Sequence, residues 1–303
     1  MKCNLCPRRC NTQRNETAGF CGMTETVTAA RAALHMWEEP CISGTNGSGA
    51  VFFSGCTLRC VFCQNHAIAS GKSGRQISNE RLSEIFLELQ DKHANNINLV
   101  TPTHYVPMIA KALDRAFKAG LIIPIVYNTS AYENIETLKI MDGLVDVYLP
   151  DMKYMDSALS AEYSGAPDYF QAAKPALAEM YRQTGKPKFF GDEEARGLGI
   201  ESGIMKKGVI VRHLMLPGQL EDSKNIIKYV YDTYGDDVFI SLMNQYTPLE
   251  QVKDIPVLNK RVTEEEYQKL IDFARGLGVV NGFIQEGGTA KESFVPEFDC
   301  EGV

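Results

Sequence analysis

Seven short runs of apolar, β-prone residues recur along the chain, and they predict the buried strands of a parallel sheet. These runs span residues 50–54, 97–101, 121–128, 145–152, 209–216, 238–243 and 279–285. Stretches with helical periodicity lie between most of them, at roughly 104–119, 132–142, 167–183, 222–234 and 263–276. Strands that alternate with helices form βαβ units, so the pattern predicts an α/β fold.

The stretch after Ser78 shows the helical pattern clearly. Ser78 suits the N-cap position, because its hydroxyl oxygen can accept a hydrogen bond from a backbone N–H of the first turn. Leu82, Ile85, Phe86 and Leu89 follow at i, i+3, i+4 and i+7, so one apolar stripe should face the sheet.

Six or seven such units fit an open, partial TIM-type barrel of the (β/α)6 kind better than a complete barrel of eight. We expect this barrel to cover residues 50–290, with a long insertion at 154–207. Residues 1–49 form a cysteine-rich N-terminal extension before the first expected strand, and residues 291–303 form a C-terminal tail.

Composition excludes several classes of protein. The net charge is −7 and the basic residues are dispersed, which argues against a nucleic-acid surface. No apolar run reaches the roughly 18 residues of a membrane span, and the N-terminus shows no apolar core of a signal peptide. The sequence therefore predicts a cytoplasmic protein, in which nine cysteines indicate metal chemistry rather than disulfides.

Three of these cysteines are spaced Cys56-x3-Cys60-x2-Cys63, directly after the first predicted strand. Three thiolates on a tight loop can bind three irons of a [4Fe–4S] cluster and leave the fourth iron without a protein ligand. A zinc site made with His66 is an alternative, since zinc takes four nitrogen or sulfur ligands at short spacings. The long series of strands and helices that follows favours the cluster over a zinc module.

The stretch from Gly55 to Asn65 resembles the signature of the radical S-adenosylmethionine (SAM) enzymes, with Phe62 as the aromatic residue before the third cysteine. This resemblance implies that SAM binds the open iron and is cleaved reductively to a 5′-deoxyadenosyl radical. It also implies a low-potential electron donor of the flavodoxin or ferredoxin type.

Residues just past each strand end should ring the site, because chemistry in such barrels lies at the carboxyl ends of the strands. After the second strand, the start of a helix could bind a polar part of SAM, although its sequence differs from the Gly-Gly-Glu-like turn common in the family. His104 could equally be a histidine satisfied within the fold. The candidates for SAM binding are Thr101, Thr103, His104, Asn128, Ser130, Asp151, Lys153 and Arg212, and the candidates for substrate binding are Gln285 and Glu286.

Two of these assignments come from the activating enzyme of pyruvate formate-lyase. There, an Asp-x-Lys lies beside the SAM carboxylate and its bound cation, and the resemblance implies that role for Asp151 and Lys153. A plain salt bridge that closes the barrel mouth is the alternative. An arginine at the matching position of the activating enzymes contacts SAM, so Arg212 is a better candidate than His213.

Several other segments resemble a radical SAM group described as pyruvate formate-lyase activating enzyme-like. They lie at 3–10, 53–56, 101–105, 212–218, 240–248 and 283–286. The resemblance implies an oxidoreductase that takes hydrogen from a substrate, such as a glycine of a partner glycyl-radical enzyme. Radical modification of a small molecule or peptide is the alternative, and a zinc-binding interaction protein is a more distant one.

A second set of cysteines, Cys3-x2-Cys6-x3-Cys10-x10-Cys21, offers four thiolates in a short stretch. Four sulfur ligands suit either a structural zinc ion or an auxiliary [4Fe–4S] cluster. We expect a second metal centre here and favour the cluster. The sequence places no metal at Cys41 and Cys300, which are interpreted as ordinary thiols.

Overall fold

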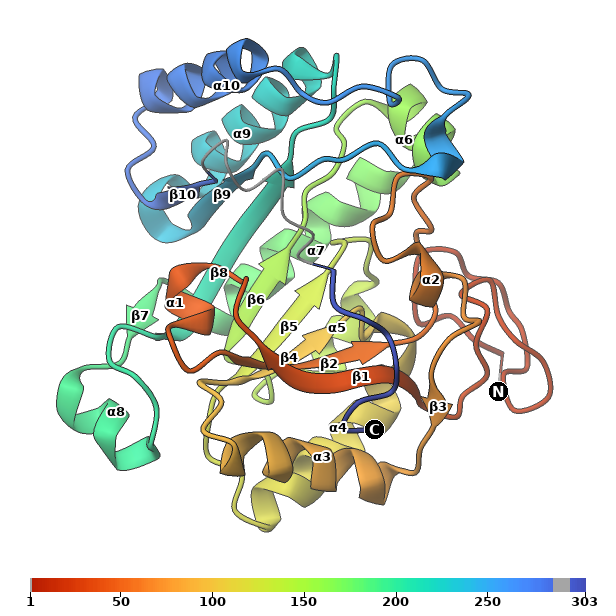
Figure 1. The fold of residues 1–303 in the computed structure, drawn as a ribbon, viewed down its shortest axis with the longest axis vertical. Helices are drawn as coiled ribbons and strands as arrows, with labels where there is room; N and C mark the ends of the chain where they lie inside the picture. The colour runs from red at the N-terminus through yellow and green to blue at the C-terminus, as the bar shows by residue number, and fades with distance from the viewer. Residues whose placement is uncertain (1, 286–294) are drawn as a thin grey trace.

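The computed structural model describes residues 2–285 and 295–303, and its centre is one mixed sheet (Figure 1). The strand order is β10-β9-β8-β6-β5-β4-β2-β1-β3, and β7 pairs with β8 outside this path. The strands are β1 (Thr28–His35), β2 (Ser48–Phe53), β3 (Arg75–Gln76), β4 (Ile97–Val100), β5 (Ile125–Thr129), β6 (Val147–Pro150), β7 (Lys188–Phe189), β8 (Met205–Leu214), β9 (Phe239–Met243) and β10 (Gly282–Ile284).

Strands β2, β4, β5, β6, β8, β9 and β10 run parallel, and they coincide with the seven runs predicted from the sequence. The prediction of an α/β fold with an open, partial barrel is therefore confirmed. The α-helices are α1 (Pro40–Ser43), α2 (His66–Ala69), α3 (Asn79–Asp91), α4 (Val106–Lys118), α5 (Ile135–Ile140), α6 (Ser157–Ser164), α7 (Tyr169–Thr184), α8 (Asp192–Leu198), α9 (Leu220–Tyr234) and α10 (Glu264–Leu277). Short 3-10 turns are η1 (Thr103–Tyr105), η2 (Gly235–Asp237) and η3 (Glu250–Val252). None of the helices in the described residues has the length and apolar character that a membrane crossing requires.

The two faces of the sheet are covered by different elements. Strand side chains such as Leu99, Tyr127 and Val211 pack with the apolar stripes of the long helices, including the predicted stripe of α3. Alternate side chains point to the other face because a strand has a period of two. There, Val126, Leu149 and Ile210 pack against Cys41 and the fully buried Ile42 of α1. The short helix α1 therefore fills part of the inner face of the partial barrel.

The N-terminal segment contains a strand that the sequence analysis did not predict. Strand β1 pairs antiparallel with β2, with Ala33 opposite Ala50 and His35 opposite Ser48. The sheet thus begins within residues 1–49, ahead of the run at 50–54 that was expected to be its first strand. The proposed division into 1–49, 50–290 and 291–303 stays a prediction.

The segment 154–207 is also richer in structure than the single helix expected there. It contains α6, α7, α8 and β7, and α7 packs against both β6 and β8. Helix α7 is therefore the crossover between two neighbouring parallel strands, so only part of this segment is an addition to the barrel pattern. The short α6 and α8 were missed because a single turn or two offers little periodicity to detect.

The C-terminal residues form hydrogen bonds with β1. The backbone N–H of Cys300 donates to the carbonyl of Ala30 at 2.9 Å, and that of Ala32 donates to the carbonyl of Glu301 at 2.8 Å. The guanidinium of Arg31 forms a salt bridge with Asp299 at 3.1 Å. The end of the chain consequently lies beside its first strand (Figure 1).

A buried carboxyl group joins the ends of β4 and β5 on the helical side. Glu133 Oε1 accepts hydrogen bonds from Thr129 Oγ1 at 2.5 Å, Thr103 Oγ1 at 2.6 Å and the Tyr127 hydroxyl at 3.3 Å. Its Oε2 atom is buried without a partner. Burial raises the pKa of Glu133 from 4.5 to about 7, although the three hydrogen bonds oppose this change.

Because the folded-state pKa of Glu133 lies above the unfolded-state value, its ionisation destabilises the fold. Stability should be fully present below about pH 4.5 and should be lost as the pH rises through 7, by up to about 3 kcal/mol. Glu133→Gln should remove this dependence. The unfolding free energy of the variant, relative to that of the wild type, should therefore rise between pH 5 and pH 8. Urea unfolding at several pH values measures it, with the exposed Glu136→Gln as control. A constant difference between Glu133→Gln and wild type would contradict the assignment.

Candidate active site at the ends of the parallel strands

A cavity of about 410 Å³ lies at the carboxyl ends of the parallel strands. This cavity brings together candidate residues from the cysteine loop and from the carboxyl-terminal parts of five strands or the residues just after them. They are Cys56, Cys60, Cys63, Thr101, Asn128, Ser130, Asp151, Lys153, Arg212 and Gln285. The parallel topology explains this convergence, because strands that run in one direction deliver their following loops to the same edge.

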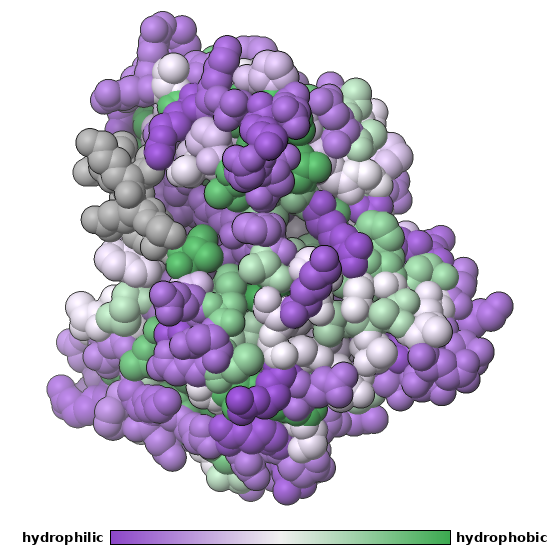
Figure 2. All heavy atoms as spheres, turned by 45° about the vertical axis from the view of Figure 1, so that its right-hand side comes forward, coloured by the Kyte–Doolittle hydropathy of each residue, from purple (hydrophilic) through white to green (hydrophobic). Residues whose placement is uncertain are grey.

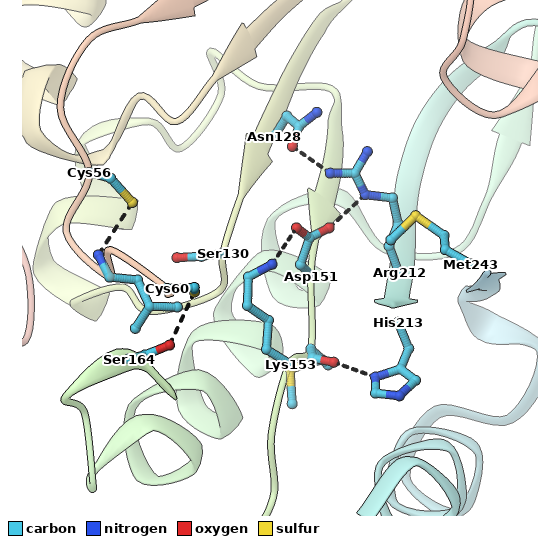
Figure 3. A network of polar contacts seen from close by, with 12 residues as sticks. Cys56, Cys60, Asn128, Ser130, Asp151, Lys153, Ser164, Arg212, His213 and Met243 are labelled. Atoms are coloured by element: carbon cyan, nitrogen blue, oxygen red, sulfur yellow. Dashed lines mark hydrogen bonds and ion pairs between the residues drawn. The ribbon is translucent and has the colours of Figure 1, made fainter. Parts of the chain in front are cut away.

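The cysteine loop begins where β2 ends. Gly55 has a φ of 88°, and a Cβ atom there would lie 2.7 Å from the carbonyl oxygen of Cys21, so only glycine fits. The next turn directs backbone N–H groups at sulfur: Leu58 and Arg59 donate to Cys56 Sγ at 3.4 Å and 3.5 Å. The hydroxyl of Ser164 in α6 also donates to a sulfur atom, Cys60 Sγ, at 3.1 Å (Figure 3).

These contacts fit thiolates that bind a metal cluster. N–H and O–H donors at sulfur stabilise negative charge on it, as in iron–sulfur sites. Burial raises the pKa of Cys60, and it raises the pKa of Cys63 to about 12, while the ammonium group of Lys153 opposes both changes. Without a metal, the thiols of Cys60 and Cys63 are therefore protonated at neutral pH, and a metal would have to displace their protons.

No group of three or more His, Cys, Asp or Glu side chains in the described part of the chain is already arranged to hold a metal ion. The zinc alternative required His66 to complete the set with the three cysteines. His66 is exposed at the start of α2 and does not line the cavity, whereas all three cysteines do.

Opposite the cysteines, four charged side chains form a continuous row. Lys153 Nζ lies 2.9 Å from Asp151 Oδ2, Arg212 Nε lies 2.7 Å from Asp151 Oδ1, and Arg212 Nη1 lies 2.8 Å from Glu38 Oε2. Arg212 Nη2 also donates to Asn128 Oδ1 at 2.6 Å. Figure 3 shows Asp151 between Lys153 and Arg212. The salt bridge that the sequence allowed between Asp151 and Lys153 is present, within a larger network.

The row holds its charges despite burial. Burial alone would raise the pKa of Asp151, but the adjacent Arg212 and Lys153 outweigh it and lower that pKa. Burial alone would lower the pKa of Arg212, but the neighbouring Asp151 and Glu38 outweigh it and raise that pKa. Asp151, Lys153 and Arg212 are consequently charged at neutral pH.

Two acidic residues of this site were missed by the sequence analysis. Glu38 and Glu39 lie between β1 and α1, and both line the cavity. Glu38 Oε1 accepts from Asn98 Nδ2 at 2.9 Å, and Glu39 is buried with its Oε2 atom unpartnered. The adjacent acids in Trp37-Glu38-Glu39-Pro40 are the only signal in the sequence, and nothing local to them indicates a partner in β8.

Some predicted residues lie elsewhere. Thr103 is bonded to Glu133, and His104 Nε2 lies 2.7 Å from the carbonyl oxygen of Ser54, so both are buried away from the cavity. Burial lowers the pKa of His104 to about 3, so its ring is neutral. The sequence also allowed a histidine satisfied within the fold, but only Nε2 has a partner here, and Nδ1 is buried without one. Glu286 lies outside the described residues. Figure 3 shows His213 pointing away from Arg212, towards the carbonyl of Met152 at 2.7 Å.

Gln285, the remaining substrate candidate, fixes a loop beside the cysteines. Its Oε1 atom accepts from the backbone N–H of Asn244 at 2.9 Å, and its Nε2 atom donates to Gln245 Oε1 at 3.1 Å. The carbonyl of Gln245 in turn accepts from Gln64 Nε2, next to the third cysteine, at 2.9 Å. Gln285 therefore connects β10 to the cysteine loop through the loop that follows β9.

The chain is similar to several known proteins in sequence or in structure. A curated relative, an uncharacterised protein of Methanocaldococcus jannaschii, is 28% identical over 281 residues, which cover 90% of this chain and 74% of the relative. SuiB of Streptococcus suis, bound to the precursor peptide SuiA, superposes with a TM-score of 0.51 and 14% identity. This match covers 76% of the present chain and 46% of SuiB, so the chain spans about half of that protein's length.

A radical SAM methyltransferase from Sphaerobacter thermophilus has a TM-score of 0.48, with 13% identity over 78% of this chain and 66% of the methyltransferase. The family model of the radical SAM superfamily matches residues 50–186, which include the three cysteines and the strands from β2 to β6. The chain therefore carries a radical SAM superfamily domain at residues 50–186.

Proposed function

We propose that this protein is a radical SAM enzyme that cleaves SAM reductively at a [4Fe–4S] cluster held by Cys56, Cys60 and Cys63. The observation that carries the proposal is that these cysteines face Asp151, Lys153 and Arg212 across one and the same cavity. When bound, the cluster and SAM together supply a 5′-deoxyadenosyl radical that abstracts hydrogen from the substrate. The role of the protein is then to hold, orient and shield these groups.

Lys153 is the cation best placed to meet an anionic group of SAM near the cysteines. Burial lowers the pKa of Lys153, whereas Asp151 and, more weakly, Cys60 and Cys63 raise it. Because both cysteines are close enough to have this effect, the ammonium group faces the cysteine loop. An ammonium group has three N–H donors, and Asp151 uses one of them. Lys153 therefore retains donors for a carboxylate, with Asp151 holding it in position.

Arg212 keeps this side of the cavity in shape. Its three hydrogen bonds to Asp151, Glu38 and Asn128 connect β8 to the segment after β6, the segment before α1 and strand β5. A guanidinium has five N–H donors, so two remain for SAM. Thr101, Asn128 and Ser130 complete the proposed SAM contacts. Thr101 has a φ of 60°, an unfavourable value for a β-branched residue that often marks functional sites.

A polypeptide is the proposed substrate, and an electron donor of low potential is the proposed partner. A cavity of about 410 Å³ is near the lower limit for drug-sized ligands. SAM is itself a ligand of that class, so the space beyond it suits one side chain or loop residue better than a second large molecule. SuiB, which shares the fold, is bound to a precursor peptide. Removal of hydrogen from a glycine, as in an activating enzyme-like oxidoreductase, is one reaction of this kind.

The surface offers apolar contacts for such a chain. On the face shown in Figure 2, apolar side chains gather in a band between more hydrophilic regions. Trp37 is 60% exposed and Ile284 is 41% exposed, and both line the cavity. Exposed apolar groups at the rim of a site are typical of surfaces that bind peptides.

The cysteine assignment predicts the outcome of one substitution. Anaerobically reconstituted wild-type protein should convert SAM to 5′-deoxyadenosine in the presence of dithionite. Cys60→Ala should reduce the product to the level of a protein-free control, because one of the three cluster ligands is lost. Cys300→Ser, which changes a cysteine outside the cavity, should keep full activity. Zinc at the triplet of the wild type, without SAM cleavage, would refute the proposed function.

Arg212→Lys should weaken SAM binding at least about tenfold, equivalent to about 1.4 kcal/mol. A lysine is a point charge on a flexible stem, and it cannot hold the three directed hydrogen bonds to Asp151, Glu38 and Asn128. Calorimetric titration of the reconstituted protein with SAM measures this effect. Iron content should not change, and the exposed Arg196→Lys is the matched control. Equal SAM affinity of Arg212→Lys and wild type would exclude Arg212 from the site.

The substrate class can be tested with isotopes. Candidate glycyl-radical proteins and peptides, deuterated at glycine Cα, should transfer deuterium to 5′-deoxyadenosine if a glycine is the target. A glycyl radical signal in electron paramagnetic resonance (EPR) should accompany the transfer. The same peptides without deuterium are the control. Efficient turnover of a small metabolite, with no response to any polypeptide, would overturn the proposal of a polypeptide substrate.

A further inference from the structure

We propose that Cys3, Cys6, Cys10 and Cys21 hold a second iron–sulfur cluster, directly behind the loop that carries the first set of cysteines. The radical SAM family model does not extend to these residues, since it begins at residue 50. The proposal concerns metal content rather than SAM cleavage, so it stands or falls separately from the proposed function.

The backbone folds Cys3, Cys6 and Cys10 into one compact turn. The N–H of Cys3 donates to the carbonyl of Thr12 at 2.9 Å, and the N–H of Asn11 donates to the carbonyl of Cys3 at 3.0 Å. Between them, the N–H of Arg9 closes a turn on the carbonyl of Cys6 at 3.0 Å. Arg9 and Asn11 both have positive φ values, 40° and 54°, so the chain reverses sharply on either side of Cys10.

The thiols themselves are neighbours. The thiol of Cys10 forms hydrogen bonds to Thr12 and to the thiol of Cys3. Cys6 and Cys21 are buried, and each lies close enough to Cys3 to interact with it electrostatically. All four are free of disulfide bonds.

Gly19 leaves space beside two of these thiols. A Cβ atom at Gly19 would lie 3.3 Å from Cys10 Sγ and 3.6 Å from Cys21 Sγ. No three of the thiols are yet arranged around one metal ion, so a bound cluster would have to draw them together. The open position at Gly19 gives the sulfur atoms room for that movement, and a larger residue would block it.

The segment is already fixed to the rest of the protein without a metal. Arg8 donates to the carbonyls of Thr57 at 2.9 Å and Ser164 at 2.7 Å, and Arg14 is buried with hydrogen bonds to the carbonyls of Met23 and His104. A structural zinc ion typically supplies the folding energy of a segment that lacks other contacts. These contacts leave little need for one here, and they favour a redox cluster.

The location of the group supports the same choice. The N–H of Cys56, the first cysteine of the other set, donates to the carbonyl of Cys21 at 3.3 Å. Cys21 and Cys6 are buried on this inner side, whereas Cys3 and Cys10 are partly exposed. A cluster here would lie between solvent and the first set of cysteines, a position suited to the entry of single electrons from a low-potential donor.

Removal of the first set isolates the second. The variant Cys56→Ala/Cys60→Ala/Cys63→Ala, reconstituted anaerobically with iron and sulfide, should retain about four irons and four sulfides per chain. The complementary variant Cys6→Ala/Cys21→Ala should also retain about four irons, now in the first set, and the wild type about eight. Circular dichroism should confirm that both variants are folded. One zinc per chain in the first variant, or no metal in a folded protein, would overturn the proposal.

EPR provides a test of the location. In the reduced wild type, two neighbouring clusters should broaden or split each other's signals through spin coupling. Each variant should show the simple spectrum of one cluster. A wild-type spectrum equal to the sum of the two variant spectra would contradict the close position. If the first variant holds about four irons but the wild type cleaves no SAM, the proposed function fails and the second cluster stands.

Discussion

The buried charge of Arg212 constrains the whole site. Burying a guanidinium away from water is strongly destabilising unless its charge is paired and its nitrogen atoms have hydrogen-bond partners. Here its partners come from three different segments: Glu38 ahead of α1, Asn128 in β5 and Asp151 after β6. None of these segments can shift alone without leaving a buried charge or amide unsatisfied. The network therefore holds the strand ends in register and gives the cavity a fixed polar wall.

Helix α1 prepares the place for this network. Its residues Cys41 and Ile42 cover apolar side chains on the inner face of the sheet, and Glu38 and Glu39 lie just before it. The inner face consequently changes from apolar contacts around α1 to a polar layer with Asn98, Asn128 and Arg212. Ionised groups can remain buried beside the cavity because they are paired with one another in the polar layer, while the apolar contacts around α1 stabilise the rest of the inner face.

The cysteine loop is stabilised from the other direction. Its glycine, Gly55, fits closely against the carbonyl of Cys21, and Arg8 bonds to the carbonyls of Thr57 and Leu58 in the loop. The loop thus depends on the N-terminal segment as much as on β2. Each of these contacts joins backbone to a buried or partly buried partner, which restricts the loop to one conformation and directs its thiols into the cavity.

Local chemistry in the sequence determined the parallel strands, the helical stripe after Ser78 and the spacing of the three cysteines. These features depend on residues within a few positions of one another, through the periods of strand and helix and the reach of a short loop. The strand order then followed from βαβ connections, which place Asp151, Lys153 and Arg212 at one edge. Only the tertiary structure decided that Glu38 pairs with Arg212, 174 residues away, and that His104 turns into the core. Burial and the need to satisfy charged and polar groups select such partners across the whole fold, and no local pattern contains that information.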